Sequence, residues 1–199
     1  MDGAWTSERL HEALRRHFGY ETFRDGQAEA ILNLLAGQDV MLVMPTGSGK
    51  SLCYQLTALL MPGVTVVVSP LIALMKDQVD ALERRGIAAT FLNSSVDGAE
   101  MAYRLDGVRA GRYKLVYVAP ERFRNRRFSE ALAQAQVSLF TIDEAHCISQ
   151  WGHDFRPDYL NLNQVLAKLG TARVLAVTAT ATPAVATRAT PLSRRSTNR

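Results

Sequence analysis

The chain has 199 residues, of which 47% are hydrophobic and 21% are charged, an ordinary composition for a globular domain with a real core. Its longest strand-like apolar run, at 64–68, is far shorter than the roughly 20 residues that a membrane helix needs. The N-terminus has no apolar stretch of the signal-peptide kind, and two cysteines make neither a disulfide framework nor a metal spacing. We therefore expect no membrane partner and a reducing cytoplasmic location, nucleoid-associated if the source is bacterial.

The net charge of +4 suggests nucleic-acid binding at first sight, but its distribution argues against that interpretation. Residues 183–199 contain four arginines and no acid. The remainder holds nineteen basic and nineteen acidic residues, so it is neutral. Global charge therefore gives no support for a nucleic-acid partner.

Apolar β-branched runs alternate with segments of helical periodicity along most of the chain. In chain order the patterns predict helix 7–17, helix 28–36, strand 39–44, helix 50–61, strand 64–69, helix 71–85, a weaker strand 88–92, helix 96–110, and strands 115–119, 137–142 and 174–178. Near-continuous apolar strands separated by helices favour a parallel sheet covered on both faces. The expected fold class is α/β, with three layers and a mostly parallel central sheet.

Turn and capping residues delimit several of these helices. Gly37, Gly86 and Gly111 each follow a helical pattern, as a helix stop does. Asp97 and Glu100 have the spacing of a capping box at the start of helix 96–110. These signals support the order of elements given above.

The segment DVMLVMPTGSGKSLCYQL, at 39–56, has the pattern of a strand, a glycine-containing turn and a helix. It follows the phosphate-loop pattern G-x-x-x-x-G-K-[ST], with Met44 at the first glycine position. Glycines in such a turn let backbone N–H groups face phosphate oxygens, and the following helix points its positive end at them. The predicted nucleotide-binding residues are Pro45, Thr46, Gly47, Ser48, Gly49, Lys50 and Ser51.

Two side chains of this loop have distinct expected roles. Lys50 can reach the β- and γ-phosphates of a bound nucleotide, and the Ser51 hydroxyl can hold Mg²⁺. The alternative, a glycine turn with an incidental lysine, explains the flanking strand and helix poorly. A nucleotide bound with Mg²⁺ is therefore the predicted ligand of this loop, and the family resemblance given below implies that the nucleotide is ATP.

Two acids, Asp143 and Glu144, directly follow the apolar strand at 137–142. The carboxyl ends of parallel strands meet at one edge of a sheet, so we expect both acids to face the nucleotide. Asp143 would hold Mg²⁺ through water, and Glu144 would orient and deprotonate the attacking water. The alternative, two surface acids that cap the next helix, suits so apolar a strand less well.

Together these motifs resemble the superfamily 2 helicases, and within them the RecQ family of DNA helicases, over about residues 10–187. The tracts that carry the resemblance are FGYETFRDGQ (the adenine-recognition element), MPTGSGKSLCYQL (motif I), VVVSPLIALMKDQV (motif Ia), YVAPER (motif Ib), DEAHCISQWGHDFRPDYL (motif II with an aromatic-rich loop) and LAVTATAT (motif III). Motif I or II alone would indicate only an NTPase. The tract from DEAH through FRPDY is much more specific and points to RecQ.

The resemblance implies a RecA-like P-loop NTPase domain and a division of the chain. Residues 1–25 would form an N-terminal helix and the adenine-recognition segment. Residues 26–187 would form the first helicase lobe, which binds ATP. Residues 188–199 form a basic tail that we expect to be disordered.

The resemblance also assigns roles at the nucleotide. Tyr20 and Arg24 would contact or stack on the adenine, although without the resemblance they would pass for a core aromatic and a surface cation. Gln27 would hydrogen-bond the adenine edge, because an amide both donates and accepts. His146 would link the ATP site to a second domain, and it joins Lys50, Asp143 and Glu144 as a predicted catalytic residue.

In RecQ-like proteins the loop after DEAH is taken to sense single-stranded DNA. Trp151 and Phe155 can stack on bases, and Arg156 offers a cation to phosphate or base. Because the loop is tethered to the acids, DNA binding could shift them. The alternative is a loop whose rings pack on the sheet. Cys147 and His153 match no zinc spacing.

Other candidate DNA contacts are weaker. Ser69 and Pro70 resemble the motif Ia surface, where backbone N–H groups can hold DNA phosphates. Thr178 would either hydrogen-bond the motif II region or cap its strand. The arginines at 122–127 would either track phosphate or form a solvated helix face.

Motifs IV to VI and the zinc-binding and winged-helix regions of RecQ proteins have no counterpart here, and a second lobe normally supplies the arginine finger. We therefore expect slow ATP hydrolysis, weak binding of single-stranded DNA and no unwinding by this chain. In a full-length relative it would be the front half of a 3′→5′ DNA helicase for repair or recombination, partnered by a second lobe. The alternatives are a non-hydrolysing ATP- and DNA-binding fragment, a superfamily 2 RNA helicase lobe, or a P-loop kinase, for which no acceptor lid is evident.

Overall fold

A single six-stranded sheet organises the chain in a computed structural model, which describes residues 4–148, 159, 162–170 and 172–179. The strands are β1 (Val40–Val43), β2 (Val64–Val68), β3 (Ala89–Leu92), β4 (Leu115–Val118), β5 (Val137–Ile142) and β6 (Arg173–Thr178). Their order across the sheet is β1-β6-β5-β2-β4-β3, and every described pairing is parallel. The predicted α/β class is confirmed.

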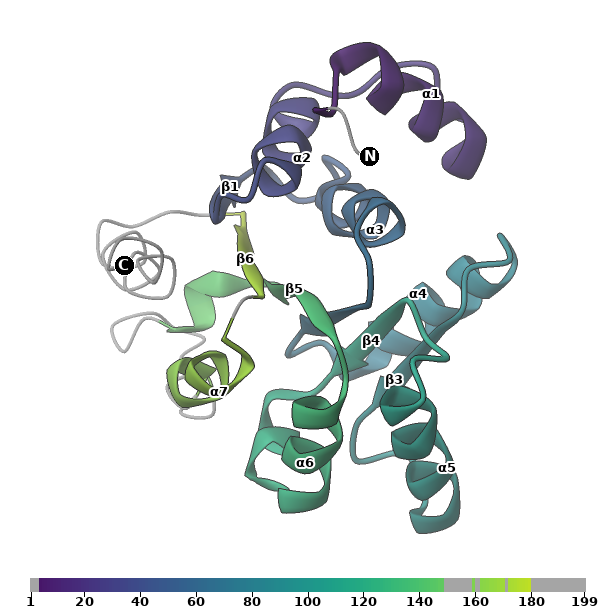
Figure 1. The fold of residues 1–199 in the computed structure, drawn as a ribbon, viewed down its shortest axis with the longest axis vertical. Helices are drawn as coiled ribbons and strands as arrows, with labels where there is room; N and C mark the ends of the chain where they lie inside the picture. Colours follow the sequence, from purple (N-terminus) through teal and green to yellow (C-terminus); the bar gives the residue numbers. More distant parts are fainter. Residues whose placement is uncertain (1–3, 149–158, 160–161, 171, 180–199) are drawn as a thin grey trace.

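Helices cover both faces of this sheet, so the domain has three layers (Figure 1). One face carries α1 (Ser7–Phe18), α2 (Gln27–Leu35), α3 (Lys50–Leu60) and α4 (Ile72–Glu83). The other carries α5 (Gly98–Arg109), α6 (Arg126–Gln134) and α7 (Leu162–Leu169). Two short 3₁₀ helices, η1 (Pro120–Arg124) and η2 (Ala145–Ile148), follow β4 and β5.

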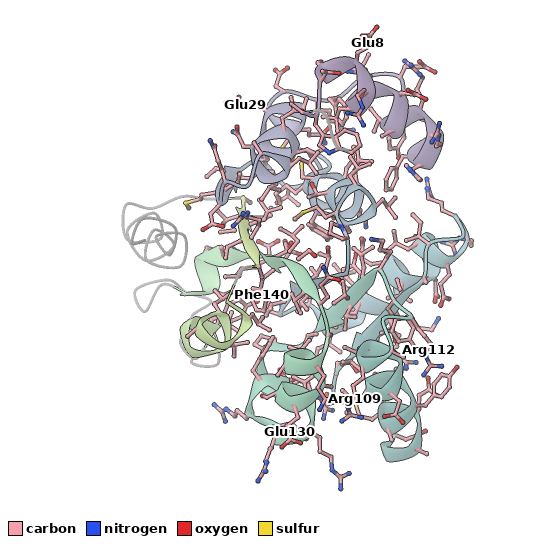
Figure 2. All side chains as sticks on the ribbon, in the orientation of Figure 1. Glu8, Glu29, Arg109, Arg112, Glu130 and Phe140 are labelled. Atoms are coloured by element: carbon pink, nitrogen blue, oxygen red, sulfur yellow. The ribbon has the colours of Figure 1, made fainter. Side chains whose placement is uncertain are left out.

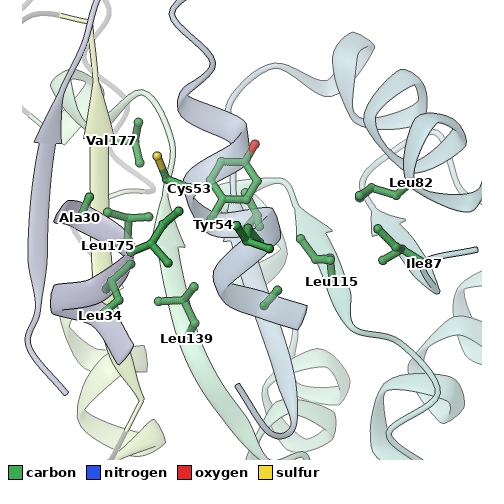
Figure 3. Packing of buried hydrophobic residues seen from close by; sticks show 14 of the residues in the cluster. Ala30, Leu34, Cys53, Tyr54, Leu82, Ile87, Leu115, Leu139, Leu175 and Val177 are labelled. Atoms are coloured by element: carbon green, nitrogen blue, oxygen red, sulfur yellow. The ribbon is translucent and has the colours of Figure 1, made fainter. Parts of the chain in front are cut away.

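The apolar strands are continuous because each is buried on both sides. In β2, Val67 packs toward α1–α4, whereas Val66 and Val68 pack toward α5–α7. Successive strand side chains point to opposite faces, so both layers draw on the same run. Figure 3 shows the first of these cores, in which strand residues Leu139, Leu175 and Val177 face Ala30 and Leu34 of α2 and Cys53 and Tyr54 of α3.

The outer helix surfaces carry the charges. Figure 2 shows Glu8, Glu29, Arg112 and Glu130 at the periphery, while Phe140 lies in the interior. No helix in the described part of the chain is both long enough and apolar enough to span a membrane.

The six predicted strands and all five predicted helices are confirmed, with ends displaced by a few residues. The Asp97 side chain accepts a hydrogen bond from the Glu100 N–H at 2.9 Å, as its predicted capping role requires. Helices α6 and α7 lie outside the prediction. For Arg126 and Arg127, the structure favours the helix-face alternative, since both are exposed on α6. The domain boundaries stay predictions, and the tail at 188–199 lies outside the described residues.

Candidate nucleotide site

The phosphate loop joins β1 to α3 at the carboxyl edge of the sheet. Gly47 and Gly49 both have left-handed backbones, with φ of 78° and 84°. A Cβ at Gly49 would also lie only 2.8 Å from Gln27 Nε2, whereas a Cβ at Gly47 would meet nothing within 4 Å. The loop therefore needs glycine at 49 for space as well as for conformation.

Lys50 and Ser51 open helix α3 directly above this turn. The Lys50 ammonium donates to the backbone carbonyls of Met44 at 3.1 Å and Pro45 at 3.2 Å, which holds it over the loop. The Ser48 hydroxyl also donates to the Pro45 carbonyl, closing the turn. The free N–H groups of a helix N-terminus and its positive dipole favour an anion at this position.

The predicted adenine residues lie beside the loop and hold it. The Arg24 guanidinium donates to the Gly47 carbonyl at 2.7 Å, and Gln27 Nε2 donates to the carbonyls of Gly49 and Ser48 at 3.0 and 3.3 Å. Gln27 Oε1 accepts the Arg24 N–H at 2.9 Å, so the two residues form one unit.

A cavity of about 630 Å³ opens beside this unit. Tyr20, half exposed, lines it together with Arg24, Gln27, Gly49 and Ser51. The three residues predicted to recognise adenine are therefore brought together next to the phosphate loop. Their contacts with a base stay a prediction.

The two acids leave the end of β5 at the same sheet edge. The Asp143 N–H donates to the Val68 carbonyl at 2.8 Å, which fixes the acid between β5 and β2. Burial and the neighbouring charge of Glu144 raise the pKa of Asp143 to about 6, against the opposing effects of the Glu144 N–H and Lys50. A cavity of about 140 Å³ is lined by Lys50, Ser51, Asp143 and Glu144.

Glu144 has a strained backbone and a specific partner. Its φ of 51° is the only positive value at a non-glycine residue among those that the structure describes. Such conformations cluster at functional sites because the surrounding structure has to impose them. The His146 Nδ1 atom lies 3.2 Å from Glu144 Oε2 and 3.2 Å from the Thr178 hydroxyl.

Thr178, at the end of β6, connects this acidic motif with the phosphate loop. It is fully buried, and its carbonyl accepts the Met44 N–H at 3.0 Å. Its hydroxyl lies beside His146. Of the two alternatives for Thr178, the link to the motif II region agrees with these contacts.

The residues at the acids fit a magnesium ion bound together with phosphate. Ser51 and Asp143 line one cavity and supply a hydroxyl and a carboxylate, both of which are oxygen ligands. The described residues contain no group of three or more His, Cys, Asp or Glu side chains that could hold a metal. Mg²⁺ commonly keeps waters and substrate phosphates as ligands, so two protein groups are enough when a nucleotide is bound.

The predicted DNA contacts divide into two sets. The Ser69 N–H donates to the Val118 carbonyl at 3.1 Å, and Pro70 has no N–H, so neither position offers a free backbone donor. The Ser69 hydroxyl accepts the Leu71 N–H at 3.3 Å and also contacts Asp143. A DNA contact at Ser69 or Pro70 stays a prediction and would need other atoms.

Residues 149–158, the main part of the aromatic-rich loop, lie outside the described residues. They include Trp151, Phe155 and Arg156. Only its final tyrosine, Tyr159, is described; its hydroxyl donates to the Asp143 carbonyl at 3.3 Å. This contact ties the end of the loop to the acid. The DNA-sensing role of the loop remains a prediction.

Three polar residues beside the acids were absent from the predicted nucleotide site; two of them are buried tyrosines, and the third is a partly buried glutamine. Tyr54, Gln78 and Tyr117 line the same cavity as Asp143. The sequence offered one indication of these residues. Tyr54 and Gln55 follow Ser51 by three and four residues, which places them on the same face of helix α3. Tyr117 lies within the apolar strand pattern at 115–119, so the sequence alone suggests a core residue there and not a residue of the site.

This geometry, a glycine turn between β1 and α3 facing two acids after β5, defines a P-loop nucleotide-binding domain with a RecA-like fold. The same fold occurs in the crystal structure of a hypothetical ATP-dependent RNA helicase from Sulfolobus tokodaii, with a TM-score of 0.70 over 96% of this chain and 56% of that chain. At 19% identity this likeness concerns the fold alone. Residues 24–188 match the DEAD/DEAH box helicase family, and the chain belongs to that family.

Among curated proteins, the chain is similar to bacterial RecQ DNA helicases. The chain is 53% identical over 181 residues to ATP-dependent DNA helicase RecQ of Bacillus subtilis, covering 88% of this chain and 31% of the relative. It is 50% identical over 168 residues to RecQ of Haemophilus influenzae, covering 84% and 27%. The chain thus spans about a third of the length of these relatives. Membership of the DEAD/DEAH box helicase family implies use of ATP, usually with Mg²⁺.

Proposed function

We propose that this chain is the ATP-binding and ATP-hydrolysing lobe of a RecQ-like DNA helicase. The observation that carries the proposal is the convergence of Lys50, Ser51, Asp143 and Glu144 on one cavity at the carboxyl edge of the sheet. The resemblance to RecQ proteins at about half identity supports DNA rather than RNA as the nucleic acid, so the RNA-helicase alternative is not favoured.

The residues of the site divide the work of phosphoryl transfer. Lys50, poised over the loop carbonyls, would move to the terminal phosphates of ATP and compensate their charge. Ser51 and Asp143 would hold Mg²⁺, which neutralises charge on the phosphate oxygens when it is bound. Tyr20, Arg24 and Gln27 would hold the base in the larger cavity.

Glu144 is the proposed general base. Its carboxylate lies on the cavity beside Lys50, where it can orient a water molecule and accept its proton. His146 Nδ1 lies 3.2 Å from both Glu144 Oε2 and the Thr178 hydroxyl. It would position the Glu144 carboxylate, and a movement of that carboxylate would be transmitted through His146 to the end of β6. The strained backbone of Glu144 is consistent with a side chain whose direction matters.

Single-stranded DNA is the proposed partner, together with a second helicase lobe. Trp151, Phe155 and Arg156 remain the proposed sensors, coupled to the acids through their loop. The second lobe would complete the site with an arginine finger, which contributes about 10³–10⁵-fold to turnover in related NTPases. The chain alone is therefore expected to hydrolyse ATP slowly and to unwind no duplex.

The test is the substitution Glu144→Gln. We expect it to preserve ATP binding within about threefold and to lower DNA-stimulated turnover at least about 10²-fold, because the base is lost while the shape is kept. The matched control is Glu29→Gln on the exposed surface of α2, which should leave turnover unchanged. Turnover that survives Glu144→Gln would contradict the assigned base.

Two outcomes of the same assay would favour an alternative. Wild-type chain that binds ATP and DNA without any turnover would indicate a non-hydrolysing binding fragment. Stimulation by an RNA oligonucleotide that greatly exceeds stimulation by the matching DNA would indicate an RNA helicase lobe.

A further inference from the structure

Strand β3 lies at one edge of the sheet. It ends the strand order, and of the strands that the structure describes only β4 pairs with it. An edge strand presents a row of backbone N–H and C=O groups that no neighbouring strand uses. Because such a row can pair with a strand of another molecule, a soluble protein needs some feature that prevents this pairing.

The sequence of this edge favours strand pairing between molecules. Residues 87–92 read IAATFL, with no charged residue, no proline and no glycine. Short segments of high β-propensity with these properties tend to form intermolecular sheets. The charges and prolines that commonly protect an edge are therefore absent from β3 itself.

The Phe91 carbonyl is on the free side of β3. The carbonyl of the next residue, Leu92, accepts the N–H of Ala119, which directly follows β4. Successive residues of a strand direct their backbone groups to opposite sides. The N–H and C=O groups of Ala89 and Phe91 therefore point away from β4.

Arg104 of α5 occupies this free carbonyl. Its Nη1 atom donates to the Phe91 carbonyl at 2.8 Å, and its guanidinium carbon lies 4.3 Å from the centre of the Phe91 ring. Its Nε atom donates to Glu100 Oε1, one turn earlier in α5, at 2.7 Å. Only 18% of the Arg104 side chain is exposed. One charged side chain therefore takes the edge acceptor and covers the ring beside it.

Arg104 reaches around the edge of the sheet. Helix α5 lies beside β3 (Figure 1), and its residues Leu105 and Val108 belong to the core formed with α6 and α7. Phe91 packs against the core on the opposite face. The Arg104 side chain thus extends from one layer past β3 to a ring of the other layer. It lies across the path by which another strand would approach.

A second arginine closes the end of β3. Arg122 of η1 donates to the carbonyl of Asn93, the residue directly after the strand. The Asn93 side chain accepts the N–H of Ser95 at 2.9 Å, which turns the chain away from the strand direction. The free edge is therefore limited to the four residues of the strand.

We propose that Arg104 blocks the free edge of β3 and thereby prevents the chain from pairing with a second copy of itself through that edge. Without the guanidinium, two β3 strands could join their sheets by backbone hydrogen bonds. A second copy fits this edge because the same uncharged segment would face itself about a twofold axis. The inference is independent of the proposed function, since Arg104 lines neither cavity of the nucleotide site.

The test replaces Arg104 by Met, which keeps a long apolar side chain over Phe91 but removes the charge and every donor. Sedimentation velocity at roughly 5–200 µM protein measures association, because self-association depends on concentration. We expect the wild type to keep the monomer mass of 22.0 kDa over this range. Arg104→Met should approach twice that mass at the upper end.

Amide hydrogen exchange identifies the surface that pairs. In Arg104→Met, the N–H groups of Ala89 and Phe91 should exchange at least about tenfold more slowly at the highest concentration than at the lowest. In the wild type their exchange should not depend on concentration. Circular dichroism at both concentrations verifies that the variant stays folded, which separates edge pairing from aggregation of unfolded chain.

Helix α1 supplies a matched control. Arg16 forms an i,i+4 ion pair with Glu12 at 3.1 Å, as Arg104 does with Glu100, but α1 packs on α2 and α3 and not on a strand edge. Arg16→Met therefore changes the charge and the side chain in the same way. It should leave the mass and the exchange of β3 at their wild-type values.

Glu100→Gln keeps the test available if Arg104→Met does not fold. It removes the carboxylate that holds the Arg104 Nε atom, so it should cause weaker association than Arg104→Met, again with slower exchange in β3. Glu12→Gln on α1 is its control.

Three results would overturn the proposal. One is a folded Arg104→Met chain, or a Glu100→Gln chain where only that variant folds, that stays monomeric with unchanged exchange in β3. Another is association of equal strength in the matched α1 variant. The third is association, in the variant or already in the wild type, that shows no difference between them in the exchange of β3.

Discussion

At the scale of single residues, the charged carboxylate of Asp143 serves the proposed site but lowers the free energy of unfolding of the ligand-free chain. Its carboxyl accepts the Glu144 N–H at 3.0 Å in a partly buried position, and its pKa is raised to about 6. Between about pH 4 and pH 6, the folded chain retains a proton that the unfolded chain has lost, so the free energy of unfolding falls as pH rises through this window. Above pH 6 the charged carboxylate is a cost to the fold.

We therefore predict that Asp143→Asn stabilises the ligand-free chain at pH 7.5, by on the order of 1–3 kcal/mol. The amide keeps the shape and an acceptor for the Glu144 N–H while it removes the charge. Thermal unfolding followed by circular dichroism measures the effect, which should vanish below about pH 4. Asp77→Asn on the exposed surface of α4 serves as the control. A lower melting temperature for Asp143→Asn at pH 7.5 would contradict the argument.

The two loop glycines provide a matched pair for a second residue-level prediction. Gly47→Ala imposes only left-handed strain, roughly 1 kcal/mol, because nothing lies near the new Cβ. Gly49→Ala imposes the same strain and also places a Cβ 2.8 Å from Gln27 Nε2. We expect Gly49→Ala to lower the melting temperature and the ATP affinity more than Gly47→Ala. Equal effects of the two substitutions in unfolding and binding assays would show that the Gln27 contact is irrelevant.

The sequence allowed the residue types of the site to be predicted, because motif spacing places Lys50, Ser51 and the two acids. It could not show how the side chains are directed. The bonds from Arg24 and Gln27 to the loop cross more than twenty residues of chain. The positive φ of Glu144 follows from its surroundings and has no local signal such as glycine.

At the scale of elements, apolar runs and turn residues were sufficient for the strands and for α1–α5. Helix α6 has its own periodicity, with Phe128, Ala131 and Leu132 buried on one face. The helix begins with two arginines that belong to a run of basic residues in the sequence, and this basic run obscures the apolar pattern. Strand order could not be predicted, because it depends on crossovers that no local pattern encodes.

The cap of α5 gives a prediction at this scale. Replacement of Asp97 by Ala removes the acceptor for the Glu100 N–H and should destabilise the chain by about 1 kcal/mol. Asp97→Asn keeps an acceptor at the same place and should be nearly neutral. Urea unfolding of both variants separates the cap from a general effect of charge. An Asn variant as unstable as the Ala variant would show that charge dominates.

At the scale of the whole molecule, the chain is one three-layer domain of a helicase family whose curated relatives are about three times as long. The phosphate loop and the two acids lie at one edge of the sheet, and Tyr20, Arg24 and Gln27 lie beside that loop. Unwinding requires two lobes that close on ATP, and we propose that this domain contributes one of them.

We accordingly predict that the purified chain separates no duplex with a single-stranded tail, even with ATP and Mg²⁺ in excess. A fluorescence assay with a quencher-labelled strand measures this directly. A full-length RecQ protein serves as the positive control for the substrate. Robust ATP-dependent strand separation by the chain alone would contradict the division of labour proposed here.

The most direct test of the central claim is ATP turnover by the purified chain, with and without single-stranded DNA, beside Lys50→Ala. The account predicts slow turnover that DNA stimulates and that Lys50→Ala abolishes together with ATP binding. ATP binding without turnover, lost in Lys50→Ala, would leave the nucleotide site in place but contradict hydrolysis by this lobe alone. Turnover or ATP binding that persists unchanged in Lys50→Ala would contradict the assignment of the phosphate loop itself.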